Sequence, residues 1–259
     1  MTTPRIYLPE KFEMGSLVEL TDDNFRYIKN VLRLKPGESV SLFGYQGCEY
    51  RAVIDEITSR SVLARISDIQ NLPEPEISII LAQSLPKSDK MDFIIQKATE
   101  LGVSGIIPFH SSRSIPKLDR RKAQDRVIRW RKIALEASRQ SGRSDIPEIA
   151  EIISFEEMLS KATATAGLKL IFWEAESGQG IKQILRSDLN EKKTNFFITI
   201  GPEGGFSGEE VQKAIDMGMT SVSLGRQVLK VETASVAILS IIQYEKGLIG
   251  MVQGNYDAI

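Results

Sequence analysis

The stretch from Asn195 to Gly247 limits what this chain can fold into more than any other. It opens with an apolar run at residues 196–200 that ends at a Gly-Pro pair, which is typical of a strand buried on both faces of a parallel sheet. Ser207 stands three residues before Glu210, and this spacing predicts a capping box at the start of a helix. The stretch therefore begins as a strand, a glycine-rich turn and a helix.

A second unit of similar design follows directly. Residues 220–224 predict a short strand, residues 225–231 a loop, and residues 232–246 a very apolar helix. Two loops that leave the carboxyl ends of neighbouring strands define a crevice, the usual ligand position in an open α/β sheet. Glycines in these loops let backbone groups approach a ligand closely; they are Gly201, Gly204, Gly205 and Gly225. Taken alone, such glycines are equally typical of tight turns between packed elements.

Common phosphate-binding patterns do not occur in these loops. The Gly-x-x-x-x-Gly-Lys pattern is absent, and Glu203 stands near a helix start, where a phosphate would have to lie. Gly178 and Gly180 lack the third glycine of a dinucleotide fingerprint. These observations argue against a nucleoside triphosphate and against a dinucleotide-dependent reductase.

Two phrases of this stretch closely resemble the paired signature of a known family. The first runs Gly-Pro-Glu-Gly-Gly-Phe-Ser-x-x-Glu from Gly201, and the second runs Leu-Gly-x-x-x-Leu-Lys-x-Glu-Thr-Ala from Leu224. Both are similar to the RsmE family of 16S ribosomal RNA uridine-N3 methyltransferases, part of the SPOUT superfamily. The resemblance implies an α/β fold with a C-terminal SPOUT domain, a mostly parallel sheet and a trefoil knot of the backbone. It also implies S-adenosylmethionine as the cofactor.

The resemblance further implies a cofactor pocket with three walls. One wall is the carboxyl end of a strand predicted at residues 168–174, and the others are the two glycine loops. A cationic sulfonium tolerates a carboxylate such as Glu203, which a phosphate would not. The residues implied to hold the cofactor are Phe172, Glu174, Ile200, Gly201, Pro202, Glu203, Gly204, Gly205, Leu224, Gly225, Val228, Leu229, Thr233 and Ala234.

The composition is that of an ordinary globular protein with room for two domains. The chain has 259 residues, of which 42% are hydrophobic and 26% are charged. Its lone cysteine, Cys48, excludes an intrachain disulfide, and its lone histidine, His110, argues against a zinc centre. The N-terminus lacks a secretory signal, and the longest apolar run, around residues 236–242, is too short to span a bilayer. We therefore expect a cytoplasmic protein with neither a metal nor a membrane partner.

Charge is unevenly distributed, although the net charge is only −1. From Arg113 to Arg143 there are eleven Lys or Arg residues and three acidic residues, so this segment carries about +8 and the remainder about −9. Much of the segment predicts a helix, residues 119–141, with a positive stripe beside an apolar one. Internal ion pairs would explain a mixed-sign helix, but three acids cannot neutralise eleven bases. The imbalance predicts a polyanionic partner such as RNA.

The N-terminal part predicts a small separate domain. A short helix capped by Asp22 or Asp23 precedes three runs of period-two alternation, which are typical of a small antiparallel sheet or barrel. These runs cover residues 40–42, 50–54 and 62–66. This part resembles the PUA-like domain of the same family, which grips RNA.

A natural linker follows at residues 71–76, because two prolines there disfavour continuation of either neighbouring element. We therefore expect residues 1–72 to form a PUA-like RNA-binding domain and residues 73–259 to form the SPOUT methyltransferase domain. The second domain begins with a predicted strand at 77–82, a helix capped by Ser88 or Asp89 and a strand at 103–109, which is a βαβ unit.

Methylation at N3 requires that the uridine lose a proton, so the site needs a base or a cation that stabilises the uridine anion. The candidate stabilisers are Arg113 and Arg139, and the candidate proton acceptor is Glu203 or a bound water. The candidate RNA-binding residues are Arg33, Lys35, Arg113, Arg126, Arg129, Arg139 and Arg143. For any single one of them, a solvated surface charge is an equally good explanation.

The sequence departs from the family pattern at Lys230, where arginine is most common. Lysine keeps the charge but loses the planar fork that binds two acceptors at once. The resemblance implies a homodimer that acts on 16S rRNA in the small ribosomal subunit. Two alternatives remain: a methyltransferase of the same fold that modifies another RNA position, and a noncatalytic RNA-binding protein.

Overall fold

The computed structural model describes residues 3–45, 48–73, 75–115, 119–187 and 189–250. Glu74 of the predicted linker and Lys117 of the basic segment lie outside these residues. The elements are β1 (Arg5–Tyr7), β2 (Leu17–Leu20), α1 (Asp22–Arg26), η1 (Tyr27–Leu32), β3 (Ser39–Phe43), β4 (Cys48–Ile57), β5 (Val62–Asn71), β6 (Ser78–Ser84), α2 (Lys90–Glu100), β7 (Gly105–His110), α3 (Arg120–Ser141), β8 (Glu148–Ile149), β9 (Ile153–Ser154), α4 (Phe155–Ala164), β10 (Leu168–Phe172), α5 (Ile181–Leu185), β11 (Asn195–Ile200), α6 (Gly208–Asp216), β12 (Thr220–Val222) and α7 (Val231–Glu245).

The chain divides into two compact units. The N-terminal unit comprises residues 1–75 together with residues 138–146, and the C-terminal unit comprises residues 76–137 and 147–259. The last turn of α3 therefore belongs to the N-terminal unit, although the rest of this helix belongs to the other. Arg5 explains the assignment, because its Nη1 donates to the backbone oxygen of Arg143 at 2.9 Å.

The N-terminal unit is built on a curled five-stranded sheet in the order β1-β3-β4-β5-β2. The period-two runs lie on β3, β4 and β5, which pair antiparallel as predicted, whereas β1 runs parallel to β3. The long β4–β5 pair changes register after Arg51 and again after Ile54, and such bulges bend a strand pair. The alternate residues bury one face, with Leu42, Tyr50 and Ile54 almost fully enclosed.

Three details of this unit differ from the expectation. The sheet path ends at β1 and at β2, so the sheet is an open half-barrel in the residues described. The strand β2 had no predicted counterpart. The predicted helix starts after Thr21 rather than after an aspartate cap, and beyond Arg26 it continues as the π-helix η1. It stops at Arg33, which is in the left-handed conformation with φ 55°.

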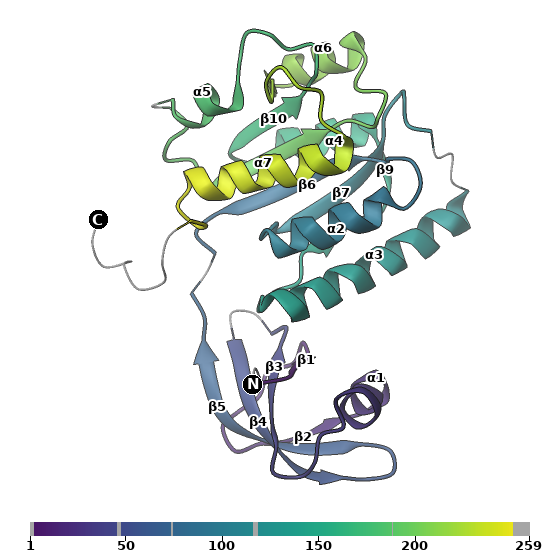
Figure 1. Cartoon of the computed structure of the whole chain (residues 1–259), viewed down its shortest axis with the longest axis vertical. Helices are drawn as coiled ribbons and strands as arrows, with labels where there is room; N and C mark the ends of the chain where they lie inside the picture. The colour runs from purple at the N-terminus through teal and green to yellow at the C-terminus, as the bar shows by residue number, and fades with distance from the viewer. Residues whose placement is uncertain (1–2, 46–47, 74, 116–118, 188, 251–259) are drawn as a thin grey trace. The chain divides into compact units, whose positions relative to one another are not determined.

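The C-terminal unit is an α/β fold around a parallel sheet in the order β12-β10-β11-β6-β7-β8, with β9 also pairing with β7. The helices α2 and α7 pack side by side over one face of the sheet, and α4 lies behind it (Figure 1). The expected βαβ unit is confirmed as β6, α2 and β7. The edge strands β8 and β9 were not predicted, because each has only two residues.

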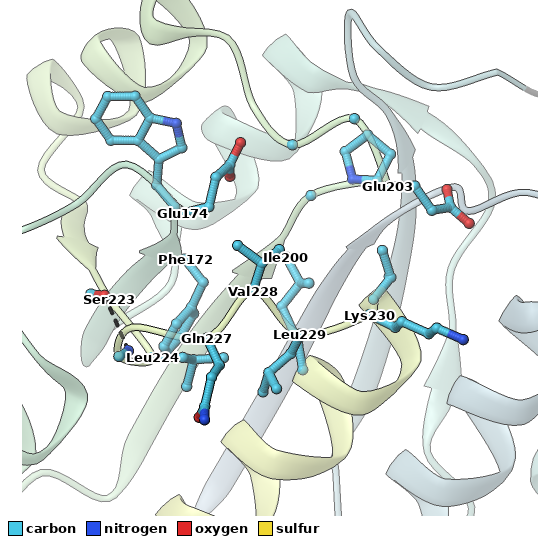
Figure 2. A pocket seen from close by; sticks show the side chains of 18 of the residues that line it. Phe172, Glu174, Ile200, Glu203, Ser223, Leu224, Gln227, Val228, Leu229 and Lys230 are labelled. Carbon is cyan, nitrogen blue, oxygen red and sulfur yellow. Dashed lines mark hydrogen bonds between the residues drawn. The ribbon is translucent and has the colours of Figure 1, made fainter.

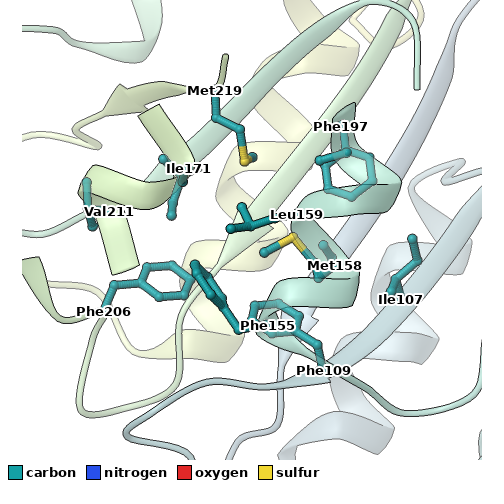
Figure 3. Packing of buried hydrophobic residues seen from close by; sticks show 13 residues of the cluster. Ile107, Phe109, Phe155, Met158, Leu159, Ile171, Phe197, Phe206, Val211 and Met219 are labelled. Carbon is teal, nitrogen blue, oxygen red and sulfur yellow. The ribbon is translucent and has the colours of Figure 1, made fainter. Parts of the chain in front are cut away.

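The face that α4 and α6 cover carries a dense aromatic and aliphatic core (Figure 3). Phe109, Phe155 and Phe206 meet with ring centroids 6.1–6.4 Å apart. Both helices begin with a capping box, Ser154 with Glu157 in α4 and Ser207 with Glu210 in α6. The box predicted at residues 207–210 is therefore confirmed.

One expectation about the sheet was wrong. The strands β11 and β12, which precede the two glycine loops, are not neighbours, because β10 lies between them and pairs with both. The loops therefore leave the sheet from either side of β10, and the carboxyl end of β10 forms the floor between them. The knotted path of the backbone stays a prediction.

Candidate active site

A cavity of about 390 Å³ opens at the carboxyl ends of β10, β11 and β12. Every residue implied by sequence resemblance to hold the cofactor lines it, except Thr233. Thr233 is exposed on the first turn of α7, whereas the next residue, Ala234, lines the cavity. The remaining lining residues are Lys90, Trp173, Val222, Ser223, Arg226, Gln227, Lys230 and Val231.

The lining has an apolar part and a charged part. Phe172, Ile200, Val228 and Leu229 approach one another from the strand ends and the 225–230 loop (Figure 2). Val228 is 82% exposed although it is apolar. The charged side chains of Glu203 and Lys230 lie on one side of the view, and that of Glu174 lies across from them (Figure 2). A concave, largely apolar site with a few fixed polar groups is what small-molecule ligands require.

Two glycines are needed for the shape of these walls. Gly205 has φ +67°, and a Cβ there would lie 2.0 Å from Glu174 Oε1. The carboxylate of Glu174 therefore rests directly against the backbone of the first loop. Gly225 has φ +116°, and a Cβ there would meet no heavy atom within 4 Å. The second loop thus presents bare backbone to open space, and such a backbone can approach a bound adenosine closely.

Glu203 is held from two directions. Lys90 Nζ lies 2.9 Å from its Oε1, and the backbone N–H of Lys87 donates to both carboxylate oxygens at 3.1 and 3.2 Å. Burial alone would raise the pKa of the Glu203 carboxyl, but these hydrogen bonds outweigh burial and hold the pKa below its ordinary value. Glu203 is therefore ionised and a weak base at neutral pH.

Lys90 also reaches a second carboxylate. Its Nζ lies 3.3 Å from Oε2 of Glu232, in the first turn of α7. The hydrogen bond to Glu203, with a smaller contribution from Glu232, raises the pKa of Lys90. The turn before α2 is strained, because Ser88 has φ 55°, which costs a non-glycine residue about 1–2 kcal/mol.

Arg113 lies against the outside of the first glycine loop. Its Nη1 donates to the backbone oxygen of Gly204 at 2.8 Å, and a Cβ on Gly204 would lie 3.2 Å from Arg113 Cβ. The preceding residue, Ser112, is fixed by two hydrogen bonds to Glu210 at the start of α6. The structure thus brings two predicted catalytic residues, Arg113 and Glu203, to the same loop.

Arg139, the third predicted catalytic residue, belongs to the N-terminal unit. Its guanidinium lies 4.4 Å from the ring centroid of Tyr27, which is a cation–π contact. Arg143 lies in the same unit and pairs with Asp145 at 2.6 Å.

The other predicted RNA-binding residues lie in different surroundings. Arg33 and Lys35 are exposed after η1. Arg129 of α3 pairs with Asp92 of α2 at 2.6 Å. Arg126, one turn earlier, makes no ion pair with any residue that the structure describes. The positive stripe on α3 is therefore only partly matched by local acids.

Lys90 is the lining residue that sequence reasoning missed most clearly. The additional loop residues adjoin predicted ones, whereas Lys90 lies more than 100 positions before the loops. Its one sequence signal is that the phrase Ser-Leu-Pro-Lys-x-Asp-Lys-Met-Asp, which starts at Ser84, resembles the same family. Nothing in that phrase points to a carboxylate partner for Lys90.

Within the described ranges, no group of three or more His, Cys, Asp or Glu side chains is placed to hold a metal ion. Nor is any helix in those ranges both long enough and apolar enough to cross a bilayer.

Comparison with known proteins finds one matching family model for the N-terminal part of the chain and another for the C-terminal part. Residues 73–243 match the family model described as an RNA methyltransferase domain, and residues 20–67 match the one described as an RNA methyltransferase PUA domain. Ribosomal RNA small subunit methyltransferase E of Bacillus subtilis is 32% identical over 246 residues, which cover 93% of this chain and 94% of the relative.

Two solved structures that contain S-adenosylmethionine are also similar. A methyltransferase from Legionella pneumophila with bound cofactor is 31% identical to this chain, with a TM-score of 0.83. The match covers 94% of this chain and 98% of the Legionella chain. Ribosomal RNA small subunit methyltransferase E from Neisseria gonorrhoeae, bound to S-adenosylmethionine, is 33% identical with a TM-score of 0.82 and the same coverage. Since the domain model spans most of the chain and these relatives match nearly all of it, the protein belongs to the RsmE family of ribosomal RNA small subunit methyltransferases.

Proposed function

We propose that this protein transfers a methyl group from S-adenosylmethionine to N3 of a uridine in the 16S rRNA of the small ribosomal subunit, in the cytoplasm. The observation that carries the proposal is the cavity at the carboxyl ends of β10, β11 and β12. It has bare backbone at Gly225, apolar walls and a carboxylate, Glu203, at its edge. These features suit an adenosine and a cationic sulfonium.

The cavity residues bind and orient the methyl donor in this proposal. Phe172, Ile200 and Leu229 supply apolar walls that exclude water, and the backbone of the two glycine loops supplies hydrogen-bonding groups. S-adenosylmethionine supplies an electrophilic methyl carbon. Holding the donor and the uridine in line removes much of the entropic part of the barrier, because the reacting atoms no longer have to find each other.

The uridine loses its N3 proton, its nitrogen bonds to the methyl carbon, and the carbon–sulfur bond breaks with its electron pair remaining on sulfur. Arg113 stabilises the uridine anion, since its guanidinium already lies on the first loop through its bond to Gly204. Arg139 is the second residue that we propose for this role. A bound water accepts the proton, because Glu203 forms an ion pair with Lys90 and its lowered pKa makes it a weak base.

RNA is held by the predicted basic residues, of which Arg126 on α3 and the pair Arg33 and Lys35 near η1 support the proposal best. Arg33 and Lys35 are exposed, and Arg126 has no ion pair in the described part of the chain. Phosphates of the RNA would supply the negative charge that the three local acids do not.

We further propose that the protein is a homodimer. The packed helices α2 and α7 carry exposed aromatic side chains, Phe93 at 45% and Tyr244 at 64% exposure. Exposed apolar surface on packed helices is typical of subunit interfaces. Size-exclusion chromatography with light scattering should give about twice the chain mass of 28.9 kDa.

The function is tested with small ribosomal subunits from cells that lack this methyltransferase. Purified protein and methyl-labelled S-adenosylmethionine are added, and the modified base is identified by mass spectrometry of nuclease fragments. We expect a single 3-methyluridine in 16S rRNA. Naked 16S rRNA, run in parallel, tells whether the assembled particle is the substrate.

Two other outcomes would replace the proposal. Label on a different base would indicate a methyltransferase of the same fold with another target. RNA binding without any heat of S-adenosylmethionine binding in calorimetry would indicate a noncatalytic RNA-binding protein.

A further inference from the structure

Lys90 joins parts of the cavity that are far apart in the sequence. Among the described residues that line the cavity, it alone comes from α2. Its ammonium contacts Glu203, on the loop after β11, and Glu232, in the helix turn after the second glycine loop. The strands that precede the two loops do not pair with each other, since β10 lies between β11 and β12. Lys90 is thus a direct charged link between them.

The ammonium of Lys90 offsets the repulsion between the carboxylates of Glu203 and Glu232. Both carboxylates lie within 3.3 Å of one nitrogen, so without the ammonium two like charges would face each other across a partly enclosed site. The side chains of Lys90, Glu203 and Glu232 are only 32%, 23% and 23% exposed, and water therefore screens that repulsion incompletely. Removing the ammonium should push the two loops apart.

The backbone before α2 is shaped to bring two donors to one carboxylate. Ser88 adopts φ 55° without being a glycine. As a result, the backbone N–H of Lys87 and the Nζ of Lys90 converge on Glu203 from either side of the turn. Strained non-glycine residues of this kind gather at functional sites, where the surrounding contacts hold them in place.

We infer that Lys90 is a positioning residue for the methyl donor, because it clamps the two glycine loops at the spacing that the cofactor needs. The clamp itself carries a net charge of −1, from one ammonium and two carboxylates. This inference rests on the proposed function, since it assigns S-adenosylmethionine to the same cavity.

The test measures S-adenosylmethionine affinity by calorimetry for the wild type, Lys90→Met and Lys90→Arg. Methionine keeps an unbranched side chain that is one atom shorter, and it removes the charge. We expect Lys90→Met to weaken binding tenfold or more, and Lys90→Arg to recover most of the affinity because its charge persists. The matched control is Lys97→Met, since Lys97 lies on the same helix and pairs with Glu100 at 2.8 Å, away from the cavity.

A second variant, Glu232→Gln, keeps the inference testable if Lys90→Met does not fold, as judged by circular dichroism. This variant leaves Lys90 paired with Glu203 but removes the ion pair between Lys90 and the first turn of α7. We expect its affinity for S-adenosylmethionine to be threefold to tenfold weaker. Unchanged affinity in the folded variants would overturn the role of Lys90 while leaving the proposed function intact. Absence of binding by the wild type would instead overturn the proposed function.

Discussion

The carboxylate of Glu210 accepts hydrogen bonds from both the backbone N–H and the hydroxyl of Ser112, at 2.7 and 2.8 Å, although 98 residues separate them. Glu210 also closes the capping box of α6, where it accepts from the N–H of Ser207 at 2.9 Å. One carboxylate with 7% exposure therefore fixes both the start of a helix and the segment that carries Arg113.

Replacement of Glu210 with glutamine should destabilise the protein and misplace Arg113. The amide keeps the shape but loses the charge and one acceptor oxygen, so we expect the free energy of unfolding to fall by about 1.5–3 kcal/mol in urea titration. The control is Glu157→Gln, because Glu157 closes the equivalent box of α4 with Ser154 and is exposed. It should lower the free energy of unfolding clearly less than Glu210→Gln does, because water can replace the hydrogen bonds of an exposed carboxylate. Equal losses in the two variants would contradict the added role of Glu210.

Arg113 should matter for the chemical step more than for cofactor binding. Its guanidinium contacts the loop through the oxygen of Gly204 but does not line the cavity. We expect Arg113→Met to lower kcat by about 10²–10³-fold, with the calorimetric affinity for S-adenosylmethionine within about threefold of wild type. Arg186→Met is the control, since Arg186 pairs with Glu245 at 2.8 Å. A loss of affinity as large as the loss of kcat would refute the assignment.

Gly205 and Gly208 give a matched pair of glycine substitutions. Alanine at Gly205 would meet Glu174 Oε1 at 2.0 Å and would have to hold φ +67°, whereas alanine at Gly208 meets nothing within 4 Å. We expect Gly205→Ala to lose at least about 1–2 kcal/mol of unfolding free energy from the backbone alone, and to bind the cofactor more weakly. Gly208→Ala, at the first position of α6, should leave both quantities unchanged or raise stability slightly. Urea titration measures the free energy of unfolding of both variants. A Gly205→Ala variant as stable as Gly208→Ala would contradict this account of Gly205.

The ion pair between Lys90 and Glu203 should stabilise the protein equally across intermediate pH, and this stabilisation should be lost at low pH and at high pH. Glu203 has a pKa lowered from 4.5, so its contribution to stability is present above that pH and is lost as the pH falls through the lowered pKa. Lys90 has a pKa raised from 10.5, so its contribution is present below that pH and is lost as the pH rises through the raised pKa. The difference in Tm between the wild type and Lys90→Met should therefore be constant at intermediate pH and shrink at both extremes. A difference that changes near neutral pH would indicate another titrating group.

Arg126 and Arg129 should differ in how their removal affects RNA binding. Arg129 pairs with Asp92, which also accepts from the indole of Trp130 at 3.0 Å, so Arg129→Ala should reduce stability as well as RNA affinity. Arg126→Ala removes a cation without an ion pair in the described chain. It should weaken RNA binding mainly through phosphate contact, and the slope of log affinity against log salt should fall by about 0.7–0.9. An unchanged slope would place Arg126 outside the RNA contact.

The sequence by itself determined the periodic elements, because their signals are local. The period-two runs predicted β3, β4 and β5, and the Ser207–Glu210 spacing predicted the start of α6. The family resemblance also identified 13 of the 21 residues that line the cavity, because most of these residues follow one another in the two glycine loops.

Only the tertiary structure decided which elements lie beside one another. Strand order depends on packing between distant segments, so sequence reasoning placed β11 next to β12, whereas β10 separates them. Sequence reasoning also missed the strands β8 and β9, because a strand of two residues has no periodic signal. Side-chain partners across the chain have no local signal either. The contact of Lys90 with two carboxylates, and that of Glu210 with Ser112, exist because the folded sheet brings separate loops within hydrogen-bonding distance.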